Sequence, residues 1–100
     1  MKVTETRSED KITLSVEGRI DTTTAPELQN CILAAFQKGN NIVVDFEEVA
    51  YISSAGLRSL LIGQKTAASK GGKMVLANVS DTVMEIFDTT GFSDILNFEG

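Results

Sequence analysis

The chain has 100 residues, of which 42% are hydrophobic and 23% are charged, a composition typical of one globular domain with a single core. Nine basic and fourteen acidic residues give a net charge of −5, which argues against a binder of nucleic acids, because neutralising phosphates requires a basic face. The absence of histidine excludes His–Cys zinc sites and Ser-His-Asp triads, and a single cysteine, Cys31, excludes an internal disulfide.

No segment of the sequence is predicted to enter a membrane or to direct export. The longest aliphatic run in the candidate helices, Leu60–Ile62, is far shorter than the roughly 20 residues that span a bilayer. Residues 1–6 are polar and alternating, unlike the apolar core of a signal peptide. We therefore expect a single domain over residues 1–100 that is monomeric and acts in the cytoplasm.

The first part of the chain predicts two strands. Residues 3–7 alternate weakly between apolar and polar side chains, and residues 11–17 alternate clearly, with Ile12, Leu14 and Val16 on one face. The short polar link at residues 8–10 favours an antiparallel hairpin.

Residues 22–38 predict a helix. Thr24 and Glu27 have the spacing of a capping box, and Gly39 is suited to end the helix. Five residues recur at helical spacing as one apolar stripe: Leu28, Cys31, Ile32, Ala35 and Phe36. On this stripe Cys31 is a small core residue, with a reactive thiol as the less favoured alternative.

The remaining chain alternates between strands and helices. The predicted elements are a strand buried on both faces at 41–46, a shorter apolar stretch at 49–52, a helix at about 55–69, a strand at 73–78, a helix from Ser80 or Asp81 to Gly91, and a last short strand at 95–98. This order predicts an α/β fold with a mixed sheet of four to five strands and helices packed mainly on one face.

The helix at 55–69 has two distinct faces in the sequence pattern. One is apolar and contains Leu57, Leu60, Leu61 and Ala68. The other contains Arg58, Ile62, Lys65 and Ser69 and resembles a solvated face. Ile62 is unusual there, so it either contacts a partner or packs under an N-terminal residue.

Two adjacent hydroxyl residues, Ser53 and Ser54, lie where an apolar stretch meets this helix. Their simplest role is to cap the helix. The same position also suits a phosphoryl group, because a helix N-terminus presents free N–H groups and a partial positive charge. The small residues Ala55 and Gly56 would leave a hydroxyl accessible to a kinase.

The order and spacing of several motifs resemble the STAS domain family over nearly the whole chain, and within it the bacterial anti-sigma factor antagonists. The two main motifs are Gly18-Arg19-Ile20-Asp21 after a strand and Ile52-Ser53-Ser54-Ala55-Gly56-Leu57 before a helix. Three weaker motifs agree with them: Val43-Val44-Asp45-Phe46, Gly71-Gly72-Lys73-Met74 and Ile86-Phe87-Asp88-Thr89-Thr90-Gly91-Phe92.

The resemblance implies a mechanism of partner switching. Such an antagonist binds an anti-sigma factor that is also a serine kinase, and this binding frees the sigma factor. The kinase phosphorylates the antagonist on one serine and the complex dissociates, after which a serine phosphatase restores the active form. ATP and magnesium belong to the kinase, so the resemblance implies no cofactor and no metal site for this chain.

The family pattern Asp-Ser-Ser/Thr-Gly-Leu places the phosphorylated serine on Ser54, with Ser53 as the second choice. It also implies that Asp21 aids kinase recognition, although an aspartate before three threonines can instead form a turn or cap. This chain departs from the pattern at Ser53, where the family has Asp, and at Ala55, where it has Ser or Thr. The implied partner-binding residues are Asp21, Thr22, Ser53, Ser54, Ala55, Gly56, Leu57, Arg58 and Ile62.

Two other classes of function are alternatives to this interpretation. An enzyme with Ser54 as nucleophile needs a base, yet the chain has no histidine, no Gly-x-Ser-x-Gly and no Ser-x-x-Lys at these serines, so we expect no catalytic activity. An accessory subunit of a transporter or lipid-transport complex stays open, because STAS-like domains also occur there.

Overall fold

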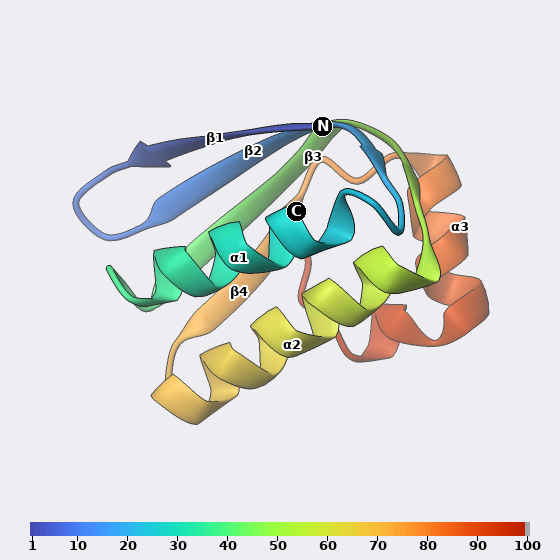
Figure 1. The fold of residues 1–100 in the computed structure, drawn as a ribbon. Helices are drawn as coiled ribbons and strands as arrows, with labels where there is room; N and C mark the ends of the chain where they lie inside the picture. The colour runs from blue at the N-terminus through green and yellow to red at the C-terminus, as the bar shows by residue number, and fades with distance from the viewer. Residues whose placement is uncertain (100) are drawn as a thin grey trace.

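The computed structural model describes residues 1–99 of the chain. Within them, four strands and three α-helices alternate after an initial hairpin (Figure 1). The elements are β1 (Lys2–Arg7), β2 (Ile12–Ile20), α1 (Ala25–Phe36), β3 (Asn41–Ile52), α2 (Ser54–Lys70), β4 (Lys73–Ala77), α3 (Asp81–Thr90) and a short 3-10 helix (Phe92–Asp94).

The strands form one mixed sheet in the order β1-β2-β3-β4. The predicted hairpin is confirmed, since β1 and β2 pair antiparallel, whereas β2 pairs with β3 and β3 with β4 in parallel. Each parallel pair is connected through a helix, as the alternation of the sequence requires. The carboxyl ends of β2, β3 and β4 therefore lie along the same edge of the sheet.

The helices cover one face of this sheet. Figure 1 shows α1 and α2 side by side in front of the strands, with α3 beyond them at one end. The alternating residues Ile12, Leu14 and Val16 of β2 are at most 4% exposed on the covered face. Phe87 of α3 packs its ring 6.3 Å from that of Phe46 and 5.7 Å from that of Phe98, measured between ring centres.

Strand β2 is longer than the alternation predicted, because it continues through two bulges. The register with β3 shifts between Ser15 and Glu17 and again between Gly18 and Arg19. Gly18 has φ +107°, a conformation that side chains with a Cβ rarely adopt. After the second bulge Ile20 is fully buried, so the irregularity returns the strand to the core just before the turn into α1.

Several predicted element boundaries were wrong. The segments at 41–46 and 49–52 belong to one strand, β3, because pairing with β2 continues past the two exposed glutamates between them. Residues 95–98 form no strand; the chain makes the 3-10 helix and then a single parallel bridge from Phe98 to Leu76. Ala68 of α2 is exposed, while small residues that the pattern did not mark, Ser59 and Gly63, are buried instead.

Candidate functional site

The site lies where the β2–α1 turn and the β3–α2 turn meet at the carboxyl ends of their strands. The backbone N–H of Ser53 donates to the carbonyl oxygen of Ile20 at 2.8 Å, which holds the two turns together. Ligands of open α/β sheets commonly bind at this edge. The parallel pairing of β2 with β3 thus brings the two main sequence motifs side by side.

Ser53 is the N-cap of α2. Its backbone is extended, with φ −90° and ψ 174°, and its side-chain oxygen accepts the N–H of Gly56 at 3.3 Å. Its carbonyl oxygen accepts the N–H of Leu57 at 2.9 Å, which begins the helical hydrogen bonds. The capping role expected for a serine at this junction is therefore filled by Ser53.

Ser54 is the first residue of α2 and is exposed. Its hydroxyl forms no hydrogen bond within residues 1–99, so it does not act as a helix cap. Because the Ser53 side chain already accepts the N–H of Gly56, the fold does not need the Ser54 oxygen as a helix cap. Two adjacent hydroxyls that look alike in the sequence thus have different roles in the fold.

Asp21 organises the turn into α1. One of its carboxylate oxygens accepts the N–H groups of Thr24 and Thr23, each at 3.0 Å, and also lies 3.1 Å from the Thr24 hydroxyl. The hydrogen bond from the Thr24 backbone, together with those from the Thr24 side chain and the Thr23 backbone, holds the pKa of Asp21 below its usual value. The turn alternative for this aspartate is thus what the structure shows.

The capping box predicted at Thr24 and Glu27 is wrong. Thr24 does precede α1, but its side chain makes no capping bond to the helix. Its hydroxyl instead lies 2.9 Å from the Arg19 carbonyl oxygen and accepts the N–H of Asp21 at 2.9 Å. The threonine side chain is held in the turn by the Asp21 carboxylate and the Arg19 carbonyl oxygen, while the Glu27 N–H that a capping box would satisfy donates to the Thr24 carbonyl oxygen at 3.0 Å.

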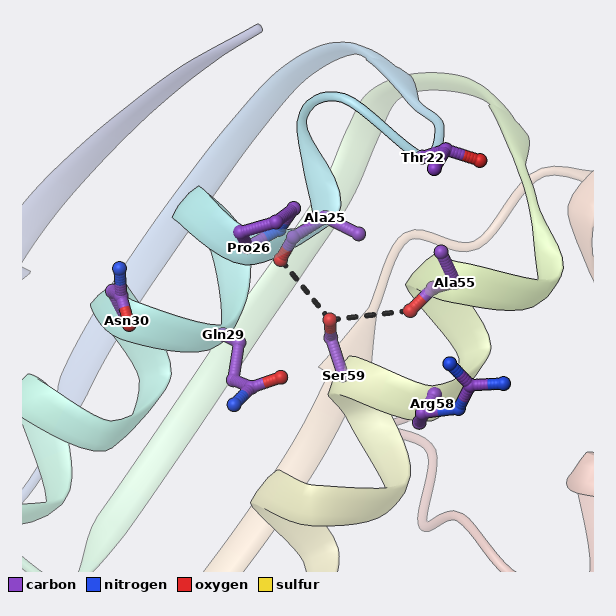
Figure 2. Close-up of a pocket in the computed structure, with 8 residues that line it drawn as sticks. All are labelled: Thr22, Ala25, Pro26, Gln29, Asn30, Ala55, Arg58 and Ser59. Carbon is purple, nitrogen blue, oxygen red and sulfur yellow. Dashed lines mark hydrogen bonds between the residues drawn. The ribbon is translucent and has the colours of Figure 1, made fainter.

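A shallow groove of about 290 Å³ separates the N-terminal turns of α1 and α2 (Figure 2). Its floor includes Ser59, which is 2% exposed and donates its hydroxyl to the carbonyl oxygen of Ala25 at 3.0 Å or of Ala55 at 3.2 Å. Among the residues that the structure describes, Arg58 is the one charged residue that lines the groove. The full lining is Thr22, Ala25, Pro26, Gln29, Asn30, Ala55, Arg58 and Ser59.

The residues implied in partner binding lie at this end of the molecule, except Ile62 in the middle of α2, and they differ in exposure. Thr22, Ser54 and Arg58 are exposed, and Asp21, Ser53, Ala55 and Ile62 are partly buried. Gly56 and Leu57 are buried, Leu57 to 6% exposure, so neither offers a side chain to a partner at the surface. A Cβ at Gly56 would lie 2.6 Å from methyl and methylene carbons of Ile20 and Ile52, which shows how closely α2 approaches both strands.

One pair at this edge was not found in the sequence. The guanidinium carbon of Arg19 lies 4.4 Å from the ring centre of Tyr51, which is 36% exposed. The two residues are register partners on β2 and β3. Arg19 belongs to the first motif and Tyr51 directly precedes the second, but only the parallel register, with its bulges, brings them together.

Within residues 1–99, no helix is both long and apolar enough to cross a bilayer, and no cluster of three or more His, Cys, Asp or Glu side chains is placed to hold a metal ion. Burial raises the pKa of the Cys31 thiol, with a smaller contribution from the Glu27 carboxylate. This cysteine on α1 therefore has the character of a packing residue rather than a nucleophile.

The fold has been seen in solved proteins. A candidate anti-sigma factor antagonist from Thermotoga maritima superposes with a TM-score of 0.88 at 19% identity, covering 96% of this chain and 84% of the other. The Bacillus protein SpoIIAA in its phosphorylated form gives a TM-score of 0.74 at 19% identity, with 99% and 92% covered. At this identity the likeness defines a class of α/β fold, the one shared by these antagonists.

The sequence comparisons are more specific. The STAS domain family model matches residues 2–99. A protein named anti-sigma-B factor antagonist from Listeria monocytogenes is 35% identical over 99 residues, covering 94% of this chain and 86% of the relative. Its namesake from Bacillus subtilis is 29% identical over 91 residues, with 91% and 84% covered. The chain belongs to the STAS domain family, which confirms the resemblance found in the sequence.

Proposed function

We propose that this protein is an anti-sigma factor antagonist whose binding is switched by phosphorylation of Ser54. The unphosphorylated form binds an anti-sigma factor that is also a serine kinase, the phosphorylated form releases it, and a serine phosphatase reverses the change. Relatives named anti-sigma-B factor antagonist, which this chain matches over 84% and 86% of their length, support this class. SpoIIAA, a structural neighbour, is known in both unphosphorylated and phosphorylated forms.

The observation that carries the proposal is the division of roles between Ser53 and Ser54. Ser53 caps α2 through the N–H of Gly56, so modifying it would remove a helix cap. Ser54 is exposed at the first position of the same helix. A kinase can reach its hydroxyl without loss of the cap, which favours Ser54 as the acceptor and leaves Ser53 as the second choice.

The physical effect of the phosphate is large enough for a switch. A phosphoserine carries roughly −1.5 to −2 charges and three strong acceptor oxygens. At a docking surface the dianion must lose water without a matching cation on the partner, which costs up to several kcal/mol. Because about 1.4 kcal/mol changes an affinity tenfold, one phosphate is sufficient to release a complex.

The arrangement supports binding rather than catalysis. Within residues 1–99 the Ser54 hydroxyl has no hydrogen-bonded base, and the chain contains no histidine that could serve as one. We infer that the chain works as a monomer in the cytoplasm, contacts neither nucleic acid nor membrane, and needs no cofactor. The surface offered to the kinase comprises the exposed residues around the two turns, with Asp21 fixing the shape of one of them.

The proposal is tested by affinity capture followed by intact-mass measurement. The tagged protein is incubated with extract of its source bacterium, and the captured kinase is then purified and mixed with it in the presence and absence of ATP and magnesium. We expect binding without ATP, and with ATP a mass gain of about 80 Da together with release of the partner.

Two variants decide the site. Ser54→Ala should keep the partner and gain no mass, whereas Ser53→Ala should still gain mass under the same conditions. Full phosphorylation of the Ser54→Ala protein would overturn the assignment and move it to Ser53. Capture of a membrane ATPase in place of a kinase would instead support the accessory role in a transport complex.

A further inference from the structure

Arg58 lies four residues after Ser54 on α2, and therefore on the same face of the helix. Residues at this spacing have Cβ atoms about 5–6 Å apart and form ion pairs when their charges are opposite. Arg58 is exposed, and the two ion pairs found among residues 1–99, Arg7–Glu5 and Lys38–Glu5, do not involve it. Arg58 also lines the groove between α1 and α2 (Figure 2).

Among residues 1–99, the other helices near this end supply no competing cation, and Lys2 and the N-terminal amine of Met1 lie at the start of β1, beside β2 rather than beside the start of α2. Helix α1 carries one charged residue, Glu27, and α3 carries only the acids Asp81, Glu85 and Asp88. In the neighbouring turn, Asp21 binds backbone N–H groups, and Arg19 stacks on Tyr51. Arg58 is therefore the unpaired basic side chain best placed to meet a new negative charge on Ser54.

We propose that Arg58 is the intramolecular partner of the phosphate on Ser54 and pairs with it across one turn of α2. This rests on the proposed function, because it takes Ser54 as the phosphorylated residue. A planar guanidinium matches two phosphate oxygens at once, which a lysine ammonium cannot do. The pairing needs only a rotamer change of an exposed side chain, with no change of the backbone.

The pairing gives phosphorylation two effects at the docking surface. It adds an anion at the start of α2, and it occupies the one charged side chain that lines the α1–α2 groove. A partner that places an acidic side chain against Arg58 in the unphosphorylated form loses that contact at the same time as it meets the phosphate. Arg58 thus acts as a specificity-determining residue for the difference between the two forms.

The experiment uses protein with phosphoserine incorporated at position 54 during translation, so no kinase is required. The second pKa of the phosphate, ordinarily about 6, is measured by phosphorus NMR in about 0.1 M salt, where the Debye length is about 10 Å. We expect Arg58→Gln to raise this pKa by about 0.3 units, Arg58→Lys to raise it less, and the difference between the parent and Arg58→Gln to shrink in about 1 M salt. The positive end of the helix acts on all variants alike, so their difference isolates the side chain at position 58.

Lys65→Gln is the matched control. Lys65 is exposed on the same helix but lies eleven residues after Ser54, about 16 Å along the axis and beyond the Debye length, so its removal should leave the phosphate pKa unchanged. Titrations of the parent and Arg58→Gln that coincide would overturn the pairing. The proposed function would fail separately, through absence of an ATP-dependent mass gain on the unmodified protein.

Discussion

Replacing Gly56 by alanine tests the close approach between the start of α2 and the ends of β2 and β3. A Cβ at this position would lie 2.6 Å from Ile20 Cγ2 and 2.6 Å from Ile52 Cγ1. The two isoleucines are 0% and 2% exposed, so neither can move toward solvent to make room. Either the helix must shift away from the sheet or the two side chains must leave their preferred rotamers.

The expected cost follows from two opposing effects. Overpacking a filled core costs about 1–3 kcal/mol, and the contacts here are far below the roughly 3.5–4.0 Å at which carbon atoms attract, which places this substitution at the upper end. Alanine in place of glycine gains about 1 kcal/mol of helix propensity. We therefore expect a net loss of about 2 kcal/mol in the free energy of unfolding, or roughly 8–16 °C in Tm for a domain of this size.

The measurement is urea unfolding followed by circular dichroism, in which the midpoint should fall while the slope stays the same. Gly63→Ala is the matched control in the same helix. Its Cβ would lie 2.8 Å from Met74 Sδ and 2.9 Å from Ile32 Cγ2, and the flexible thioether should allow a smaller loss. A Gly56→Ala protein as stable as its parent would refute the claim that this turn is rigidly packed.

Three further predictions concern the same end of the molecule and helix α1. Ser53→Ala should lower the free energy of unfolding by about 1 kcal/mol and Ser53→Asp should lower it less, because aspartate also caps helices; equal Tm values for the two variants would contradict the capping role. The lowered pKa of Asp21 means that its carboxylate stabilises the fold above its unfolded pKa of about 3.9 and loses that effect as the pH falls through the lower, folded pKa. Asp21→Asn should therefore be less stable than the parent at neutral pH and equal to it in strong acid, as thermal unfolding across pH would show, and a pH-independent difference would count against this account. The Cys31 thiol, with its raised pKa, should react slowly with a disulfide reagent in the native protein and rapidly after unfolding in guanidinium, whereas similar rates would mean that burial does not protect it.

Much of the fold is predictable because its hydrophobic patterns are local. Residues 11–17 and the stripe from Leu28 to Phe36 each belong to one element that faces the core with one side. The repeat of their apolar residues therefore has the period of a strand in the first case and of a helix in the second. The sequence could not show that β3 is continuous, because its exposed glutamates break the apolar pattern while backbone pairing with β2 persists. The last strand was predicted wrongly because residues 95–98 have the apolar composition of a short strand, whereas only Phe98 forms a bridge, to Leu76.

The candidate site was located by the sequence but not resolved by it. Ser53 and Ser54 are both good capping residues, and only the extended backbone of Ser53 decides which oxygen points at the helix N–H groups. Thr24 has the spacing of a capping threonine, but the Asp21 carboxylate accepts its backbone N–H and lies 3.1 Å from its hydroxyl, which holds that side chain in the turn and away from α1. The proximity of the two motifs depends on tertiary pairing, which no local pattern contains.

The solvent-facing position of Ser54 has a consequence for how a partner would distinguish the modified from the unmodified protein. Within residues 1–99 no buried group forms a hydrogen bond with its hydroxyl, so a group attached there would displace no side chain of the core. The modified and unmodified proteins would then share one backbone conformation. A binding partner would distinguish them by the surface charge and side chains around position 54. Such a partner could change its preference over evolutionary time while the modified domain stayed as it is.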